Sequence, residues 1–257
     1  MELLIVGGGR MGEALLGGLL AAGRELAVAE VSPARREELS AAYPDVEVVE
    51  APIPADGAVL VVKPGYVAEA ARAVADAGAG RILSVAAGVT TRAIEEAAGR
   101  ALPVVRAMPN TPALVRAGAA AISPGSSAGE DDLAWAEEIL GAVGVVVRVP
   151  ETQLDAVTGL SGSGPAYVFV VAEAMAEAGV LAGLPRAEAE TLAFQTLLGA
   201  ARLLVEGGDS PAALRAAVTS PGGTTAAGLR ELERHGVRAA FLEAVTAAAE
   251  RSRELGA

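Results

Sequence analysis

The sequence predicts an α/β fold in the first half of the chain and an all-helical fold in the second half. Up to residue 150, short apolar runs alternate with helical patterns, which is typical of a doubly wound parallel sheet. Beyond Pro150 the β-type runs stop and only helical patterns follow. Aromatic residues make up 3% of the chain, which suits close-packed helices and buried parallel strands better than an aromatic-rich sandwich.

Six strands are predicted in the first half, with helices between them. Because a connection from strand through helix to parallel strand is right-handed, this alternation favours a parallel sheet. The predicted strands are Leu3–Val6, Leu26–Ala29, Val46–Val49, Val59–Val62, Ile82–Ala86 and Val104–Ala107, and the helices Met11–Ala22, Pro33–Ala42, Val67–Ala77 and Arg92–Ala98. Two further runs, Ala119–Ile122 and Val145–Val149, flank a predicted helix at Glu130–Leu140 and should extend the edge of the sheet.

Helices with glycine, proline or serine in the turns between them fill the second half. They are predicted at Thr152–Thr158, Pro165–Ala182, Arg186–Glu206, Pro211–Val218, Thr225–Arg234 and Arg238–Leu255. The segment Gly159–Gly164 lacks the pattern of a phosphate loop or a nucleophile elbow, so we interpret it as a flexible turn. The domain boundary is placed near residue 150, which gives a first domain of residues 1–150 and a second of residues 151–257.

Composition excludes several classes of function. The 20 basic and 32 acidic residues give a formal net charge of -12, which disfavours nucleic acid and anionic membrane surfaces as partners. Cysteine is absent, which excludes disulfides, thiolate zinc sites and cysteine nucleophiles, and no cluster of histidines or carboxylates indicates a metal. No run of about 20 apolar residues and no basic leader segment is present, so we expect a cytoplasmic protein.

The first predicted strand runs into the glycine-rich segment Gly7–Gly12 and then into a helix. This is the setting in which a GxGxxG pattern binds a dinucleotide. Gly7 permits the tight turn, Gly9 lets the backbone approach a pyrophosphate, and Gly12 allows close packing of helix on strand. An ordinary glycine-rich turn is the alternative, and the matched context favours the nucleotide site.

The residues after the second strand bear on the choice of cofactor. Glu30 stands where an acidic residue takes the ribose hydroxyls, and its carboxylate would repel a 2'-phosphate, which favours NADH. Ser32, Arg35 and Arg36 follow at once and could cradle such a phosphate. They could equally be solvated turn residues, so the choice between NADH and NADPH stays open.

Three later strands end in residues suited to a nicotinamide. Lys63 is the single lysine of the chain and follows the fourth strand, at the sheet edge where ligands gather. A lysine at this position suggests a compact ammonium that a guanidinium cannot replace. The alternative is that the only lysine of the chain stands there by coincidence. Ala86 would let a flat ring approach the backbone, and Asn110 offers both a donor and an acceptor.

In the helical half, the segment Ser220–Thr225 precedes an amphipathic helix. Its glycines free backbone N–H groups that could bind a small carboxylate, and its threonine hydroxyls could donate laterally. The alternative is an ordinary capped turn, in which Thr224 or Thr225 satisfies the first amides of the helix. His235, the only histidine, is interpreted as a C-terminal cap of that helix, and Trp135 as helix core.

Taken together, several motifs resemble the pyrroline-5-carboxylate reductase family, from Gly7 to about Leu255. They are Gly7–Gly12, VKPG at 62–65, AMPNTPALVRAG, GLSGSGPAYVF and VTSPGGTTAAGLRELE. The resemblance implies an N-terminal Rossmann-like domain, an all-helical dimerisation domain, and reduction of pyrroline-5-carboxylate to L-proline with NADPH or NADH. It also implies a homodimer at least, assembled into a decamer as a pentamer of dimers.

The glycine pattern, the strand ends and the resemblance together give the predicted site. Thr225 is expected to bind the ring nitrogen of the substrate and, with Lys63, to be catalytic. Cofactor binding is assigned to Gly7, Gly9, Arg10, Met11, Gly12, Glu30, Ser32, Arg35, Val62, Lys63, Pro64, Ala86 and Asn110, and substrate binding to Ser220, Gly222, Gly223, Thr224 and Thr225. Two alternatives stay open: another Rossmann reductase for an imine, a hydroxyacid or a flavin-like partner, and a non-catalytic NAD(P)-binding sensor.

Overall fold

The computed structural model describes residues 1–256 and divides the chain into two compact units. Unit 1 comprises Met1–Ser163 and the C-terminal segment from Thr246, and unit 2 comprises Gly164–Val245. The change from strands to helices falls at residue 150 as predicted, but the compact units divide later. The reason is that helix α6, Leu154–Val157, packs on two strands of the sheet and so belongs with unit 1.

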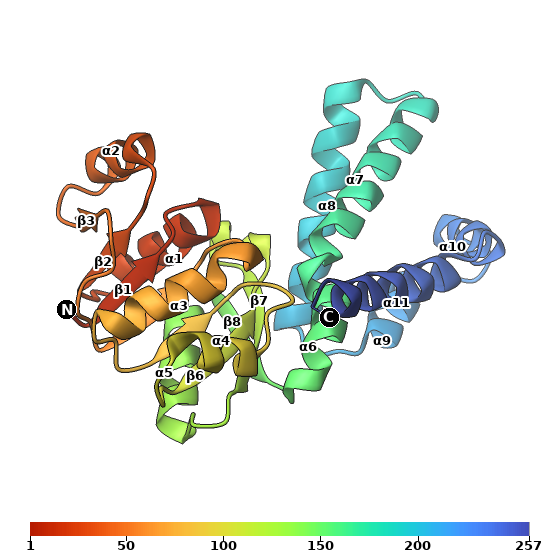
Figure 1. Ribbon diagram of the computed structural model, residues 1–257. Helices are drawn as coiled ribbons and strands as arrows, with labels where there is room; N and C mark the ends of the chain where they lie inside the picture. The colour runs from red at the N-terminus through yellow and green to blue at the C-terminus, as the bar shows by residue number, and fades with distance from the viewer. Residues whose placement is uncertain (257) are drawn as a thin grey trace. The chain divides into compact units, whose positions relative to one another are not determined.

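Unit 1 is built on an eight-stranded sheet of order β3-β2-β1-β4-β5-β6-β7-β8 (Figure 1). All neighbouring strands are parallel except β6 and β7, so the predicted doubly wound fold is confirmed, with one antiparallel pair inside the edge strand β8. The strands are β1 Leu3–Val6, β2 Leu26–Ala29, β3 Glu47–Val49, β4 Gly57–Leu60, β5 Ile82–Ser84, β6 Val104–Met108, β7 Gly118–Pro124 and β8 Gly144–Arg148.

Strand β4 begins two residues earlier than its valine run predicts. Gly57 pairs with Leu3 in the ladder, and a Cβ on it would lie 2.3 Å from the ring of Trp135. A glycine therefore opens this strand because the indole leaves no room for a side chain. Trp135 is buried, which confirms its predicted place in the core.

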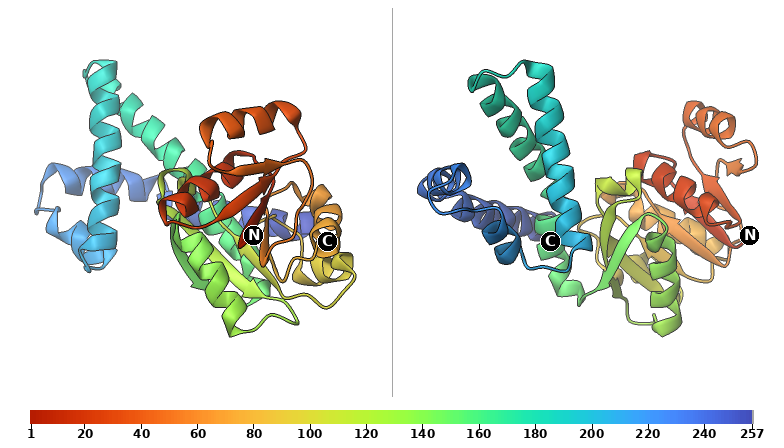
Figure 2. Two further views of the ribbon diagram at one scale, coloured as in Figure 1. Left: turned by 90° about the vertical axis from the view of Figure 1, so that its left-hand side faces the viewer. Right: turned by 180° about the vertical axis from the view of Figure 1, so that it is seen from behind.

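Helices cover both faces of the sheet (Figure 2). Alternate residues of β1 face opposite sides, with Leu3 and Ile5 in one apolar core and Leu4 and Val6 in the other. Helices α1 Arg10–Ala21, α2 Pro33–Ala42 and α5 Glu130–Gly141 contribute to the first core, and α3 Val67–Asp76 and α4 Thr91–Ala98 to the second.

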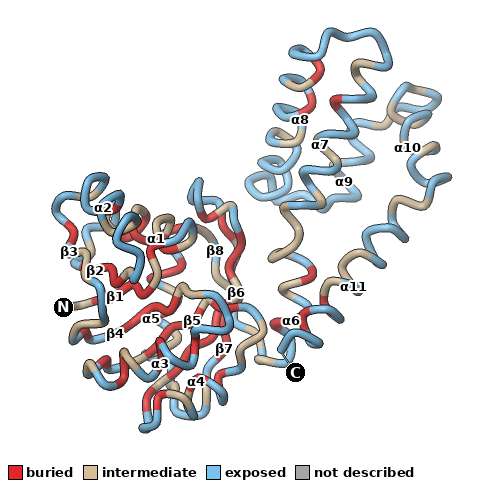
Figure 3. Tube along the Cα trace, turned by 45° about the horizontal axis from the view of Figure 1, so that its top comes forward, coloured by how far each residue is buried: buried red, intermediate tan, exposed pale blue. Residues whose placement is uncertain are grey.

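Unit 2 is all-helical, as predicted. Its elements are α7 Gly164–Leu181, α8 Arg186–Glu206, α9 Pro211–Ala217, α10 Thr224–Arg234 and the first part of α11 Val237–Gly256. His235 ends α10 as its C-cap, which confirms that prediction. Helices α7 and α8 pack together through small residues, including Ala176, Ala189 and Ala193, while most of their surface is exposed (Figure 3).

The segment predicted as a flexible turn is instead helical. Thr158–Gly162 forms a π-helical turn between α6 and α7, in which the Ser163 amide donates to the Thr158 carbonyl at 2.8 Å. The π-helical turn includes Gly159 and Gly162, so these glycines do not interrupt the helical segment. Consequently Glu151–Leu181 is long and apolar enough to cross a membrane by length and composition, and the expectation that no such segment exists was wrong.

Candidate active site

The glycine-rich segment between β1 and α1 has the geometry of a dinucleotide-binding turn. Gly7 has a φ of 106°, and a Cβ there would lie 2.4 Å from the Val61 carbonyl oxygen. A Cβ on Gly12 would lie 2.0 Å from the Gly7 oxygen, so a side chain would push α1 away from the turn. The predicted tight turn and close helix packing are therefore confirmed.

The N-terminus of α1 is open toward a ligand. Gly9 is its N-cap and makes no side-chain capping bond, and nothing lies within 4 Å of the position that a Cβ on Gly9 would take. Arg10 is exposed in the first turn, whereas Met11 is half-buried and packs on the core. Free amides at the positive end of a helix dipole, with space in front of them, are what a pyrophosphate requires.

Glu30 is held at the carboxyl end of β2 by backbone amides. One carboxylate oxygen accepts from the Gly8 amide at 2.8 Å and the other from the Ser32 amide at 2.8 Å. The Ser32 hydroxyl caps α2 by accepting from the Arg35 amide at 3.4 Å. Glu30 thus stands beside the glycine turn in a fixed orientation, as ribose recognition requires.

Each nitrogen of the Arg35 guanidinium forms a hydrogen bond with another group of the protein. Its Nε donates to the Gly8 carbonyl at 2.7 Å, one terminal nitrogen contacts Glu38 at 2.8 Å, and the other contacts Glu13 at 2.5 Å. Hydrogen bonds to Glu38 and then Glu13 raise the pKa of Arg35 above its ordinary value. The sequence did not indicate Glu13 as a site residue, because nothing in its spacing connects it with Arg35, 22 positions away. Glu38 lies only three positions from Arg35 on α2, where such an ion pair is common, so its spacing did not mark it as part of a site.

Neighbouring groups complete this cluster. The Tyr43 hydroxyl donates to Glu13 at 3.4 Å, and burial, followed by the charge of Glu13, raises the pKa of Tyr43. Arg36 donates to the carbonyls of Glu30 and Val31 at 2.8 and 2.9 Å, and its other terminal nitrogen lies 3.4 Å from Glu50. Both arginines that follow β2 are therefore already bonded to oxygens of the chain.

The predicted nicotinamide residues lie where parallel strands end at one edge of the sheet. Lys63 precedes the short helix Pro64–Tyr66 after β4; its side chain is exposed, and no ion pair joins it to another described residue. Ala86 is buried after β5. Gly88 follows, and its backbone lies beside Gly256 of α11, so the C-terminal helix borders this edge.

Asn110 is buried after β6 and uses its amide within the protein. Its Oδ1 accepts from the Ala119 amide at 2.9 Å, and its Nδ2 donates to the Ser161 carbonyl of the π-helical turn at 3.1 Å. One N–H of the side chain remains for a ligand. Asn110 thus fixes two segments against the end of β6, a positioning role that its residue type alone did not predict.

A second buried polar cluster lies between α4, β6 and the segment before α6. The Glu151 carboxylate accepts from the Thr91 amide and hydroxyl, both at 2.8 Å, and from the Arg106 guanidinium at 3.1 Å. Burial opposes ionisation of Glu151, but the bonds from Thr91 and Arg106 outweigh it and hold its pKa below the ordinary value. The cluster ties the end of the sheet to the following helical segment.

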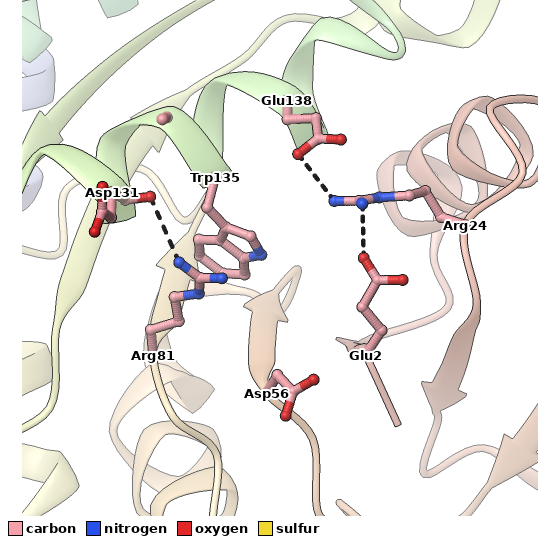
Figure 4. Close-up of a pocket in the computed structure, with 8 residues that line it drawn as sticks. Glu2, Arg24, Asp56, Arg81, Asp131, Trp135 and Glu138 are labelled. Atoms are coloured by element: carbon pink, nitrogen blue, oxygen red, sulfur yellow. Dashed lines mark hydrogen bonds and ion pairs between the residues drawn. The ribbon is translucent and has the colours of Figure 1, made fainter.

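A surface pocket of about 440 Å³ lies at the opposite edge of the sheet, where β1, β4 and β5 begin (Figure 4). Arg24 bridges Glu2 at 2.7 Å and Glu138 at 3.0 Å, and the Arg81 guanidinium stacks 4.5 Å from the centre of the Trp135 ring. The terminal nitrogens of Arg24 are paired, whereas its Nε is buried and has no hydrogen-bond partner among the described residues. Ligands of doubly wound sheets bind at the carboxyl ends of strands, so this pocket is a structural network.

The predicted carboxylate-binding segment, Ser220–Thr225, lies wholly in unit 2. Gly222 has a φ of 70°, Gly223 is the N-cap of α10, and the helix begins at Thr224, one residue earlier than predicted. Within the described part of the chain no side chain caps this helix, so the alternative of a threonine cap is not supported. The first N–H groups of an α-helix have no partner within the helix. In the first turn of α10, Thr224 is exposed and Thr225 is half-buried.

The structure gathers the predicted cofactor residues in unit 1 and the predicted substrate residues in unit 2. Two family models match the chain in the same division. The model of pyrroline-5-carboxylate reductase dimerisation matches residues 151–255, and the model described as NADP oxidoreductase, coenzyme F420-dependent, matches residues 2–88.

Individual relatives match over the full length. A pyrroline-5-carboxylate reductase of Synechocystis sp. is 47% identical over 270 residues, covering 100% of this chain and 98% of the relative. The structure of a pyrroline-5-carboxylate reductase from Coxiella burnetii has a TM-score of 0.93 at 38% identity, covering 100% and 98% of the two chains. That of a Plasmodium falciparum pyrroline carboxylate reductase with NADP bound has a TM-score of 0.83 at 26% identity, with the same coverage.

Proposed function

Because the chain belongs to the pyrroline-5-carboxylate reductase family, we propose that it transfers a hydride from NAD(P)H to the C=N carbon of 1-pyrroline-5-carboxylate, giving L-proline. This is the last step of proline biosynthesis. The observation that carries the proposal is a pair of helix N-termini without side-chain caps, α1 in unit 1 and α10 in unit 2. One suits the pyrophosphate of the cofactor and the other the carboxylate of the substrate.

The residues of unit 1 fit a nicotinamide dinucleotide. Gly9, Arg10, Met11 and Gly12 would hold the pyrophosphate, and Glu30 would hold the adenosine ribose. The segments that carry Val62, Lys63, Pro64, Ala86 and Asn110 would flank the nicotinamide, which supplies the hydride when bound. Within this arrangement the amide-anchored Glu30 carboxylate supports NADH as a competent cofactor, with NADPH as the alternative.

The residues of unit 2 fit the small anionic substrate. The amides of Gly222, Gly223 and Thr224 would bind its carboxylate, with Ser220 at the start of the turn. The Thr225 hydroxyl would bond the ring nitrogen, so that the C=N bond is held in one orientation. The substrate either binds as the iminium, whose nitrogen already carries the proton, or binds as the neutral imine and takes the proton from water. The reaction requires no metal and no protein nucleophile.

The same family membership supports the organisation of the enzyme. We assign dinucleotide binding to residues 1–150 and substrate binding with oligomerisation to residues 151–257, in a cytoplasmic enzyme. The match of a dimerisation model over residues 151–255 supports a homo-oligomer that is at least a dimer, and we propose a decamer built from five dimers.

Steady-state assays with pyrroline-5-carboxylate and each cofactor test the function, and Thr225→Ala tests the substrate site. Loss of a hydrogen bond to a charged group costs about 1.5–3 kcal/mol, so kcat/KM should fall roughly ten- to a hundredfold. NADH affinity and the oligomer should stay unchanged. Thr219→Ala is the matched control, because the Thr219 hydroxyl already donates to the Arg215 carbonyl at 2.6 Å.

The possible outcomes separate the alternatives. Wild-type turnover of pyrroline-5-carboxylate with full activity in Thr225→Ala would show that the substrate binds elsewhere. Turnover of a hydroxyacid but not of the imine would indicate a different Rossmann reductase. Binding of NADH without turnover of either would indicate a sensor.

A further inference from the structure

The surroundings of Glu30 carry an excess of negative charge. Four carboxylates gather there with two guanidiniums, a net formal charge of -2; they are Glu13, Glu30, Glu38 and Glu50, with Arg35 and Arg36. A 2'-phosphate adds about two further negative charges at neutral pH. Any preference between the two cofactors therefore depends on whether an arginine can leave its carboxylates for the phosphate.

Of the two arginines in this cluster, Arg35 bonds to the glycine turn, and each of its three nitrogens has a partner. Nε contacts the Gly8 carbonyl at 2.7 Å, so the guanidinium lies directly against the turn. Of its two carboxylate partners, Glu38 is 64% exposed and Glu13 is 37% exposed. Although the hydrogen bond to Glu38 is the larger cause of the raised pKa of Arg35, the contact with Glu13 is shorter, at 2.5 Å against 2.8 Å, and solvent screens it less, so Glu13 restrains Arg35 more.

Glu13 is itself fixed from two sides. Its backbone amide donates to the Gly9 carbonyl at 2.8 Å, which places it one turn into α1, and its carboxylate also accepts from Tyr43 at 3.4 Å. A carboxylate anchored on the helix that receives the pyrophosphate thus pulls Arg35 toward α1. With the Gly8 carbonyl and Glu38, this carboxylate occupies all three nitrogens of the guanidinium.

We propose that Glu13 is a specificity-determining residue for the cofactor, acting through Arg35. By holding the Arg35 guanidinium on itself and on the Gly8 carbonyl, it prevents Arg35 from pairing with a 2'-phosphate and so favours NADH over NADPH. Glu30 repels the phosphate, and Glu13 withholds the cation that would compensate. The inference rests on the proposed function, since it concerns the cofactor of that reaction.

Calorimetric titration of the full-length protein with NAD⁺ and NADP⁺, without substrate, tests this role. Glu13→Gln keeps the size of the side chain and a bond for Tyr43 but removes the charge that holds Arg35. We expect the affinity for NADP⁺ relative to NAD⁺ to rise about three- to tenfold. Glu38→Gln is the matched control on the same guanidinium, and it should change this ratio less than about twofold.

Two further variants separate release of Arg35 from the simple loss of a negative charge. In an Arg35→Gln background, Glu13→Gln should give no gain for NADP⁺, whereas a general charge effect would persist there. Tyr43→Phe, which frees Glu13 without removing it, should shift the ratio in the same direction by a smaller factor. An unchanged ratio in Glu13→Gln, or a gain that persists without Arg35, would overturn the inference. A wild type that binds neither dinucleotide would overturn the proposed function with it.

Discussion

Single glycines in the turn after β1 separate the needs of folding from the needs of binding. A Cβ on Gly12 meets the Gly7 oxygen at 2.0 Å, whereas a Cβ on Gly9 meets no protein atom within 4 Å. The GxGxxG pattern predicted close helix packing for Gly12 and room for a pyrophosphate at Gly9, and these distances agree with that division. The two positions can therefore be tested against each other.

Gly12→Ala should destabilise the protein, because the new methyl group forces α1 off the turn. We expect a loss of about 2–4 kcal/mol in the free energy of unfolding. Gly9→Ala should cost below about 1 kcal/mol, since its φ of -68° suits alanine, yet weaken NADH binding at least about tenfold. Denaturant unfolding and fluorescence titration measure both. Equal stability losses, or unimpaired NADH binding in Gly9→Ala, would contradict this division.

Lys63 gives a second prediction for a single residue. A surface cation in this chain is otherwise always arginine, and Lys63 has no ion pair among residues 1–256. Lys63→Arg should lower turnover strongly and leave the free energy of unfolding unchanged, because a planar guanidinium does not replace a compact ammonium beside a nicotinamide. Arg72→Lys on the exposed side of α3 serves as the control. Unaltered kinetics in Lys63→Arg would leave its rarity a coincidence of composition.

For single residues, the sequence does not predict which group each polar side chain bonds to. The type of Ser32, Arg35 and Asn110 was sufficient to mark them, but their hydrogen bonds join residues up to 51 positions apart. Glu13 carried no signal at all, since a glutamate in the first turn of a helix is common. Such pairings depend on how the elements pack, which spacing along the chain does not encode.

At the scale of elements, periodicity predicted the strands and α-helices of the sheet domain, because buried strands and amphipathic helices leave distinct patterns. The short 3-10 helices Pro64–Tyr66 and Thr111–Val115 were missed. The π-helical turn at Thr158–Gly162 was missed, since two glycines and a serine look like a break in any local pattern. Tertiary contacts hold it in place: Met108 packs against Gly162, and Asn110 binds the Ser161 carbonyl. At this junction, packing outweighs the low helix propensity of the glycines and the serine.

Glu151 joins the elements on either side of that junction, and its ionisation should make the junction sensitive to pH. The folded-state pKa of Glu151 is lowered from 4.5, so its contribution is complete above about pH 4.5 and is lost as pH falls through the folded pKa. Glu151→Gln should lower the free energy of unfolding by about 1–3 kcal/mol at pH 7. The difference from wild type should shrink on acidification.

Urea unfolding at pH 7, 5 and 3.5 measures this dependence. Glu96→Gln on helix α4 is the control, because its pair with Arg92 is exposed on both sides, so solvent screens it and the variant should unfold like the wild type at every pH. A constant difference between wild type and Glu151→Gln from pH 7 to 3.5 would mean that the carboxylate charge of Glu151 contributes nothing to stability.

For the whole molecule, the decisive feature is the apolar surface that unit 2 leaves exposed. Helices α7 and α8 bury small residues against each other and expose large ones, including Val168, Phe169, Val170, Leu192, Phe194, Leu198 and Leu204. Apolar stripes in the sequence, such as Val168, Val171, Met175 and Val180, already predict more hydrophobic surface than one small helical domain can cover. An apolar surface of this kind requires a covering partner, and the dimerisation family matches the same residues.

We therefore expect the wild-type chain to sediment as a homo-oligomer, with a dimer as its smallest stable unit and ten chains as the proposed assembly. The double variant Phe169→Asp, Phe194→Asp places two charges on side chains that are 63% and 52% exposed in the single chain, so the isolated fold should tolerate them. In the oligomer the same charges would be desolvated, and association should weaken by several kcal/mol.

Val145→Asp, at a side chain 66% exposed on the edge strand β8, is the control and should leave the assembly intact. Sedimentation velocity across micromolar concentrations gives the number of chains, and circular dichroism confirms the fold of each variant. A monomeric wild type, or an unchanged assembly in the double variant, would show that this helical surface is covered in some other way.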